Sequence, residues 1–181
     1  RTIEIHLTPY ERQFGTPISE DGSLLFTSSW EKGLFAYDTS SGNIRWHFKS
    51  TKITAMFLYS TYLVVNKSNS ALLKIDINNG ELLEQIKSGT IQHSFALNNA
   101  FVLVDSIKGK LCVIDTRTME ITMQYSKRVT NPSNCLSFLI QGANWRNGVL
   151  SIWGVEEYPE YNNELKGKRT FNRVVDSQLI L

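Results

Sequence analysis

The sequence predicts an all-β protein, a small or partial β-propeller of about four blades built from antiparallel sheets. The first observation behind this prediction is a repeat of about 38 residues. Its marker residues Asp38, Asp76 and Asp115 lie 38 and 39 residues apart. The second observation is that every copy has the same order of strands and turns. Two landmarks that stay in register over three copies indicate a repeat architecture.

Each copy contains an apolar strand, a short polar turn, a second strand that ends in Asp, another turn and a third strand. The first strands are centred near Leu25, Leu63 and Val102 and keep the spacing of the aspartates. We therefore expect three equivalent antiparallel sheets. These sheets correspond to residues 22–48, 60–86 and 98–125.

The strands and turns have the residue types that β structure requires. Runs such as YLVVN and AFVLV are rich in β-branched and aromatic residues, which suit half-buried pleated surfaces. In the turns Asp38–Gly42 and Asp76–Gly80, we expect the Asp side chain to accept hydrogen bonds from the amides ahead of it. The Gly is expected to supply a positive φ where the chain reverses. Helix content should be very low, because no long stretch has a 3.6-residue amphipathic pattern.

The first copy carries the motif of a known family. The stretch Ala36–Trp46, AYDTSSGNIRW, resembles the A-x-D-x-x-T-G-x-x-x-W tryptophan-docking unit of quinoprotein-like (PQQ-type) β-propellers, with Ser41 in place of Thr. In that family the Asp and the Gly shape the turn between the third and fourth strands of a blade, and the Trp packs between neighbouring blades. The resemblance therefore implies that Trp46 is buried between two sheets.

The motif weakens along the chain, over a resemblance that covers roughly residues 20–125. The second copy keeps Asp76 and Gly80 but has Glu84 at the position of the Trp. The third copy keeps Asp115 alone. Its residues at the Gly and Trp positions are Met119 and Met123. The resemblance indicates a fold and says little about function, since many non-enzymatic scaffolds share such repeats.

The last third of the chain departs from the repeat. Residues 135–155 are interpreted as two strands around Gln141–Gly148, and the polar, aromatic and charged segment Glu156–Arg173 as an insertion. We expect one domain, because 181 residues correspond to a single unit. Its parts are the regular repeats at 20–127 and an irregular fourth blade at 128–181, within one domain of 1–181.

Two arrangements of the blades remain open. The N-terminal strand Thr2–Leu7 could close a four-bladed ring. Alternatively, the blades form an open arc, whose uncovered sheet edges would favour self-association or a partner.

Composition excludes several classes of function. The net charge is only +2, from 19 Lys+Arg and 17 Asp+Glu, whereas nucleic-acid binders usually carry a strong clustered positive excess. No apolar run is long enough to cross a membrane, and the N-terminal stretch lacks the apolar core of a signal peptide. The two cysteines, Cys112 and Cys135, form no C-x-x-C unit; whether they pair is left open, and we expect a cytoplasmic location.

No metal or cofactor site is expected. The histidines His6, His47 and His93 lie far apart, and none is next to a Cys or a second His, so the spacing of metal ligands is missing. The adjacent cysteines of many quinoprotein dehydrogenases are missing as well.

An enzymatic function is not expected either. The sequence lacks the G-x-S-x-G, P-loop and G-x-G-x-x-G patterns that mark hydrolases and nucleotide-binding proteins. The acidic residues Glu156, Glu157 and Glu160 lie in a polar segment, where adjacent carboxylates are usually solvated.

The insertion is the first candidate for a binding site, because it breaks the repeat and combines Tyr with Lys and Arg, which often anchor interfaces. Trp30 and Trp145 lie at junctions of strands and turns, where an indole can be exposed. The predicted partner-binding residues are Tyr158, Tyr161, Lys166, Lys168, Arg169, Trp145 and Trp30.

Three functional hypotheses follow. The leading one is a non-catalytic protein-binding module, and a specific inhibitor of the immunity type, which neutralises a protein partner with an acidic surface, is its finer form. The alternative is a fragment of a larger quinoprotein-like propeller that binds a ligand or acts as an enzyme. Nucleic-acid binding through Lys166–Arg173 is disfavoured by the near-neutral charge.

Overall fold

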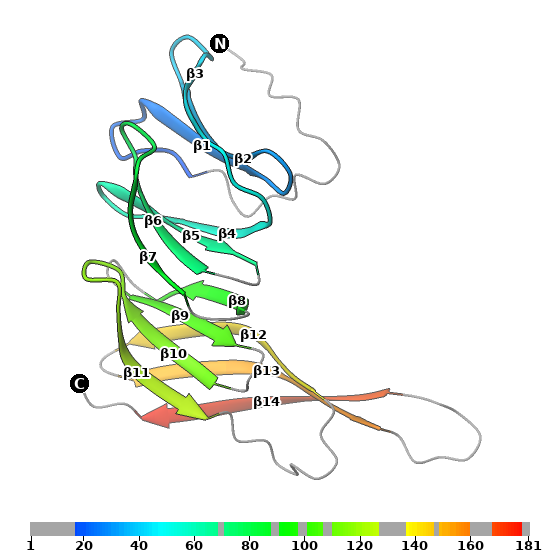
Figure 1. Cartoon of the computed structure of the whole chain (residues 1–181). Helices are drawn as coiled ribbons and strands as arrows, with labels where there is room; N and C mark the ends of the chain where they lie inside the picture. Colours follow the sequence, from blue (N-terminus) through cyan, green and yellow to red (C-terminus); the bar gives the residue numbers. More distant parts are fainter. Residues whose placement is uncertain are drawn as a thin grey trace.

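A computed structural model shows a stack of antiparallel β-sheets (Figure 1). In the part of the chain that it describes, there is no helix that could cross a membrane. The structure describes residues 17–68, 71–87, 91–97, 101–106, 110–126, 137–146, 149–159 and 168–178.

The strands form four sheets, and each strand pairs antiparallel with its neighbours. Sheet 1 consists of β1 (Leu24–Ser29), β2 (Gly33–Asp38) and β3 (Ile44–Phe48). Sheet 2 consists of β4 (Ile53–Leu58), β5 (Tyr62–Lys67), β6 (Ala71–Asp76) and β7 (Leu82–Ile86). Sheet 3 consists of β8 (Ile91–Ala96), β9 (Phe101–Ser106), β10 (Lys110–Asp115) and β11 (Glu120–Ser126). Sheet 4 consists of β12 (Ser137–Arg146), β13 (Val149–Pro159) and β14 (Lys168–Gln178).

The sheets follow one another in chain order, from sheet 1 at the top of Figure 1 to sheet 4 at the bottom. The strands β3, β7 and β11 are the last strands of their sheets and follow one another along one outer edge of the stack (Figure 1). A single bridge between Ile18 and Leu25 adds the remnant of a further strand beside β1.

The hydrophobic core is divided into three layers, one between each pair of successive sheets. Alternation along the strands divides the residues of sheet 2 between two layers. Leu63 and Val65 pack toward sheet 1, whereas Val64 between them packs toward sheet 3. This period of two is the expected result of a strand that is buried on both faces.

The predicted equivalence of the three Asp turns is confirmed. In each turn the Asp carboxylate accepts hydrogen bonds from the backbone N–H groups of residues two or three positions ahead. The distances are 3.0 and 2.8 Å at Asp38, 2.7 and 3.3 Å at Asp76 and 2.9 Å at Asp115. Gly42 and Gly80 have the expected positive φ, at 77° and 75°.

The third turn reaches the same conformation without glycine. Met119 occupies the glycine position and has a φ of 54°, a left-handed conformation that costs a residue with a Cβ about 1–2 kcal/mol. Its side chain is buried in the layer between sheets 2 and 3. Because complete burial of a Met side chain stabilises a fold by about 1.5–3 kcal/mol, packing offsets the strain of the backbone.

The sequence prediction missed two strands. The strands β4 and β8 precede the second and third predicted segments, and they turn three-stranded sheets into four-stranded ones. Their sequences, ITAMFL and IQHSFA, do share a signal that the prediction did not use, because Ile53 and Ile91, and Phe57 and Phe95, keep the spacing of 38 residues.

The last third of the chain also differs from the prediction. The proposed turn at Gln141–Gly148 is wrong in its extent, because β12 continues to Arg146. The proposed insertion at Glu156–Arg173 is largely strand, since β13 runs to Pro159 and β14 resumes at Lys168. Backbone pairing satisfies the N–H and C=O groups of such a hairpin whatever its side chains are. Polar side chains in this segment were therefore not sufficient evidence against strands. The predicted strand Thr2–Leu7 lies outside the described residues.

The glycine of the second turn generates a test of how sheets 1 and 2 are spaced. A Cβ at Gly80 would lie 2.7 Å from two atoms of the Trp46 ring, whereas a Cβ at Gly22 would meet nothing within 4 Å. Both glycines have nearly the same positive φ, 75° and 72°. We therefore expect Gly22→Ala to cost about 1–2 kcal/mol of unfolding free energy, and Gly80→Ala to cost about 1–3 kcal/mol more through overpacking.

Urea denaturation of both variants measures this difference. In a Trp46→Ala background, the additional cost of Gly80→Ala should fall to that of Gly22→Ala, because the clashing ring is gone. Equal costs of the two single variants would contradict the contact.

The first Asp turn generates a prediction about pH. Hydrogen bonds from the Ser40 hydroxyl, and then from the Ser41 backbone, lower the pKa of Asp38 from 3.8 to about 2. A carboxylate with a lowered pKa stabilises the fold above its unfolded pKa and loses this effect as the pH falls through its folded pKa. We expect the stability difference between the wild type and Asp38→Asn to be constant near neutral pH and to shrink between pH 3.8 and about 2.

Urea denaturation at several pH values between about 7 and about 2 checks this prediction. The variant Glu31→Gln, at an exposed acid of the β1–β2 turn, is the control. A difference for Asp38→Asn that does not change across the range would contradict it.

Candidate functional site

The contact between sheets 1 and 2 is made by a tryptophan. Trp46 of β3 is buried, and its Nε1 donates a hydrogen bond of 2.8 Å to the carbonyl oxygen of Ile77 in the turn of sheet 2. The ring packs near Phe26, with centroids 5.8 Å apart, and lies against Gly80. Its cross-strand neighbour is the small Ala36, which leaves room for the indole. The predicted docking role of Trp46 is confirmed.

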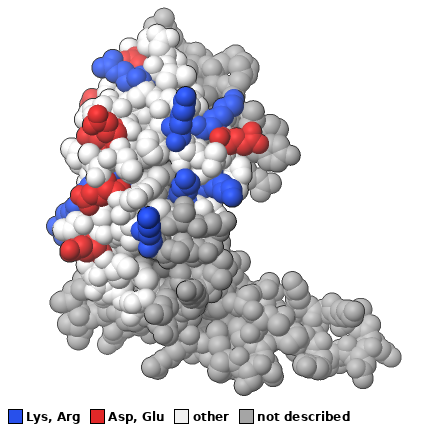
Figure 2. Space-filling view, viewed as in Figure 1, with Lys and Arg blue, Asp and Glu red and all other residues white. Residues whose placement is uncertain are grey.

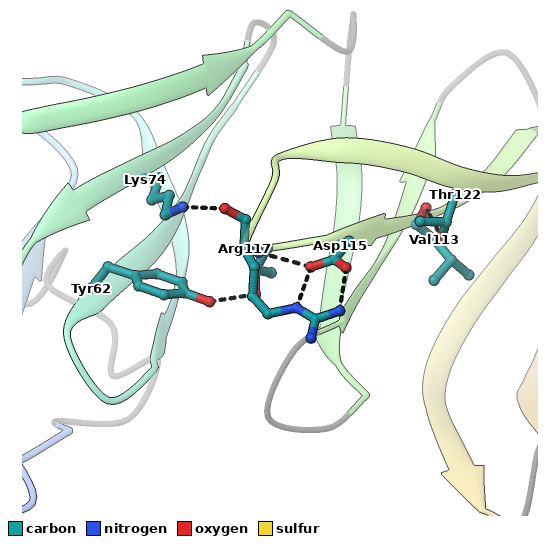
Figure 3. Close-up of polar contacts among 7 residues, drawn as sticks. Tyr62, Lys74, Val113, Asp115, Arg117 and Thr122 are labelled. Carbon is teal, nitrogen blue, oxygen red and sulfur yellow. Dashed lines mark hydrogen bonds and ion pairs between the residues drawn. The ribbon is translucent and has the colours of Figure 1, made fainter.

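The contact between sheets 2 and 3 uses other residues (Figure 3). Lys74 occupies the position that Ala36 has in sheet 1, paired with Glu84 across the strands. Its Nζ donates a hydrogen bond of 2.6 Å to the carbonyl oxygen of Arg117, in the turn of the next sheet. The same Nζ lies 4.7 Å from the centre of the Tyr62 ring and 3.6 Å from a carboxylate oxygen of Glu84. A buried ammonium group thus takes the place of the indole N–H.

Two further interactions hold that turn. The hydroxyl groups of Tyr62 and Thr116 are 2.9 Å apart and hydrogen bonded. Arg117 donates to both carboxylate oxygens of Asp115, from Nε at 3.0 Å and from Nη2 at 2.6 Å (Figure 3). This hydrogen bonding by Arg117 lowers the pKa of Asp115. The Tyr62 hydroxyl thus reaches the turn from sheet 2, whereas the Arg117–Asp115 pair lies within the turn, with the Arg117 side chain 65% exposed.

A hollow with a mixed polar and apolar lining lies between the segment before β1, the β4–β5 turn and the end of β8. It has a volume of about 530 Å³ and includes Leu58, Tyr59 and Leu97. Tyr59 stacks on Tyr62 with centroids 5.2 Å apart, and burial raises the pKa of its hydroxyl. Because Tyr59 belongs to the core between sheets 2 and 3, this hollow is in part a feature of the packing.

A second hollow, of about 600 Å³, lies on the side of the stack that carries the β1–β2 turn and the end of β5. We call it the lysine-rich hollow. Figure 2 shows basic side chains gathered toward the right of sheets 1 and 2, whereas most of the acidic ones line the left edge. Its charged and aromatic lining residues are Lys32, Lys49, Lys67, Glu31, Phe35 and His47.

The walls of the lysine-rich hollow are held by close backbone contacts. A Cβ at Gly33 would lie 2.3 Å from the carbonyl oxygen of Phe48, so only glycine lets the β1–β2 turn approach the end of β3. The N–H of Lys52 donates to the carbonyl oxygen of Trp30 at 2.7 Å. Lys52 itself has a φ of 64°, a strained conformation that such a contact keeps in place.

One wall carries an aromatic pair. The rings of Phe35 and His47 stack with centroids 4.1 Å apart and an angle of 6° between their planes. The Nε2 of His47 lies 2.7 Å from the carbonyl oxygen of Lys32, and because a carbonyl can only accept, Nε2 is the donor. Sequence reasoning assigned His47 no role and missed the lysines, which come from distant parts of the chain. The repeat held the signal, since it places the β1–β2 and β5–β6 turns on the same side.

The predicted partner-binding residues that the structure describes lie in two separate parts of the stack. Tyr158 and Arg169 pair across β13 and β14, as do Pro159 and Lys168. Trp145 pairs with Leu150 in the same sheet. These residues belong to sheet 4, at the opposite end of the stack from Trp30 in the β1–β2 turn (Figure 1). The other two, Tyr161 and Lys166, lie outside the described residues.

Trp30 is exposed to 43%, as the sequence predicted it could be. Among the described residues, no group of three or more His, Cys, Asp and Glu side chains gathers as a metal site would require. His6 and Cys135 lie outside these residues, so the pairing of Cys112 with Cys135 stays open.

Comparisons with known proteins identify the fold. No protein-family model matches the sequence, and no curated protein matches it. The structure is similar to the crystal structure of BamB from Moraxella catarrhalis, with a TM-score of 0.58 and 16% sequence identity over 87% of this chain. The fold is a partial β-propeller. The chain spans about half the length of that structure, 51%. The narrower resemblance to the quinoprotein-like repeat family has no family model behind it and stays an interpretation of the motif.

The two docking contacts predict different costs of truncation. Trp46→Ala should lower the free energy of unfolding by about 3–5 kcal/mol, because it removes a large buried aromatic side chain. Glu84→Ala, at the equivalent position of sheet 2, should cost less than about 1 kcal/mol, since Glu84 is 44% exposed and Lys74 Nζ keeps its hydrogen bond to the Arg117 carbonyl oxygen and its contact with the Tyr62 ring. Urea denaturation of both variants measures the difference, and equal tolerance would mean that Trp46 does not dock the sheets.

Proposed function

We propose that this chain is a non-catalytic protein-binding module that contacts its partner along the outer strands β3, β7 and β11. The proposal rests on one observation. A large apolar side chain is about half exposed at the same position of three successive sheets, six residues after each turn Asp. The residues and exposures are Ile44 at 55%, Leu82 at 44% and Ile121 at 49%.

The strand register explains why these side chains stay exposed. Each pairs with the first residue after a register shift in the neighbouring strand, as Tyr37 with Ile44, Ile75 with Leu82 and Ile114 with Ile121. A bulge of this kind bends the outer strand and re-aims its side chains. These strands are also the last in their sheets, so an extended segment of a partner could add to them through backbone hydrogen bonds.

The energetics support a protein partner. Complete burial of such a side chain contributes about 1.5–3 kcal/mol, so covering a half-exposed one contributes about 1 kcal/mol. A repeat scaffold holds these side chains at fixed spacing, and a preorganised surface loses little entropy on binding.

The finer hypothesis is a specific inhibitor of the immunity type. It is supported by the rigid loops of a propeller, which suit recognition. Under this proposal the hairpin of β13 and β14 supplies a further contact through Tyr158 and Arg169, and the protein acts in the cytoplasm.

A matched pair of variants tests the proposed surface. Leu82 and Gln85 are both exposed on β7, so Leu82→Asp and Gln85→Asp introduce the same charge into the same strand. Wild-type protein serves as bait in an extract of the source organism, the captured protein is purified, and its Kd for each variant is measured by calorimetry. We expect Leu82→Asp to weaken binding about tenfold, and Gln85→Asp to change it less than about twofold.

Circular dichroism of both variants checks that the fold is intact. A triple variant, Tyr161→Ala, Lys168→Ala and Arg169→Ala, tests the contribution of the C-terminal hairpin in the same assay. Recovery of no protein, or equal binding by Leu82→Asp and the wild type, would contradict the proposed surface.

A further inference from the structure

The lysine-rich hollow gathers positive charge from three separate elements. Lys32 comes from the β1–β2 turn, Lys49 from the segment after β3, and Lys67 from the end of β5. Like charges that line one hollow repel one another. An anion in the hollow would relieve the repulsion.

The hollow has little negative charge of its own. Among the described residues that line it, Glu31 is the one acid. The ion pairs between described residues, Lys74–Glu84 and Arg117–Asp115, lie between or within sheets 2 and 3. With a net charge of only +2, this local excess comes from the placement of charges rather than from their number. Such a separation creates a field that attracts an acidic ligand.

We propose that the lysine-rich hollow binds an acidic segment of a protein partner, with Trp30 as an adjacent aromatic anchor. This inference rests on the proposed function and assigns the chemistry of one contact. Lysine side chains that converge on a rigid hollow suit the carboxylates of an Asp- or Glu-rich segment. Trp30 is half exposed on the turn that bears Lys32, and tryptophan is the residue type most enriched at binding hot spots.

The geometry favours a protein segment over a nucleic acid. Nucleic-acid binders need many phosphate contacts along a groove and aromatic faces on which bases stack. The hollow supplies three lysines, and one face of Phe35 is covered by His47 at 4.1 Å. Its volume of about 600 Å³ suits a few side chains rather than a strand of nucleotides.

A direct binding assay tests the proposal without knowledge of the partner. A fluorescein-labelled octaglutamate peptide is titrated with the protein, and its anisotropy is followed at about 20 mM and about 300 mM NaCl. We expect saturable binding at low salt that weakens at least about tenfold at high salt. An octaglutamine peptide should not bind.

Two double variants that remove the same charge locate the site. Lys32→Gln with Lys49→Gln removes two positive charges from the hollow, and Arg45→Gln with Lys87→Gln removes two from exposed positions elsewhere. We expect the first pair to weaken octaglutamate binding at least about tenfold and the second less than about twofold. Trp30→Ala should weaken the binding of an octaglutamate peptide with one added Tyr more than that of octaglutamate.

Each outcome decides the matter. Equal loss of octaglutamate binding in both double variants would overturn the proposal, because it would show only a general attraction between charges. Absence of octaglutamate binding to the wild type at low salt would also overturn it. Tighter binding of an eight-nucleotide oligothymidine that depends on the same lysines would replace the protein segment by a nucleic acid. Leu82→Asp should leave octaglutamate binding unchanged. If Leu82→Asp loses the captured partner but the wild type does not bind octaglutamate, this inference alone is refuted. If the wild type binds octaglutamate but Leu82→Asp still binds the captured partner like the wild type, the proposed outer-strand surface alone is refuted.

Discussion

The structure depends on the way each sheet rests on the turn of the next. Sheet 1 reaches sheet 2 through Trp46, whose indole donates to Ile77 and lies against Gly80. The turn can receive the ring because its Asp76 carboxylate caps the backbone amides and because glycine has no Cβ. The turn residues fix the local backbone conformation, and this backbone forms the surface against which the Trp46 side chain packs. The Trp46 side chain in turn sets the distance between sheets 1 and 2. The spacing of the sheets in turn affects where hollows form on the surface.

The next interface shows which part of this contact is essential. Lys74, Tyr62 and Glu84 replace the tryptophan, yet a donor still reaches a carbonyl of the following turn, 2.6 Å from Lys74 Nζ to Arg117 O. What persists is a hydrogen bond from a large side chain to the exposed backbone of the turn. A buried ammonium group is tolerated there because a carbonyl, a ring face and a carboxylate surround it. The buried Met119 side chain then occupies the space next to that turn.

Interactions that are local and repeated could be predicted from the sequence, whereas interactions between distant residues could not. The Asp turns could be predicted because each is specified by a few neighbouring residues, and the burial of Trp46 was implied by the resemblance of Ala36–Trp46 to a known docking motif. From the sequence, Lys74 is expected to be a solvated strand residue. Its acceptor, the carbonyl oxygen of Arg117, belongs to the neighbouring sheet. The strands β13 and β14 were missed over part of their length because backbone pairing is indifferent to polar side chains. The lysine-rich hollow joins the distant Lys32 and Lys67, which only the packing of two sheets brings together.

The fold itself explains why the charges of this molecule are separated. Every copy needs an Asp in the same turn, so Asp38, Asp76 and Asp115 all lie on one side of the stack, and hydrogen bonds lower the pKa of the first to about 2. Asp38 therefore stays negative over the whole physiological pH range, whereas Asp115 is paired with Arg117. In sheets 1 and 2, most of the basic side chains in view lie on the side of the β1–β2 turn (Figure 2). Lys74 uses its charge to join two sheets, whereas Lys32 and Lys49 face solvent. Under the proposed function, an acidic segment of a partner would approach the lysine-rich hollow rather than the Asp turns, because opposite charges attract.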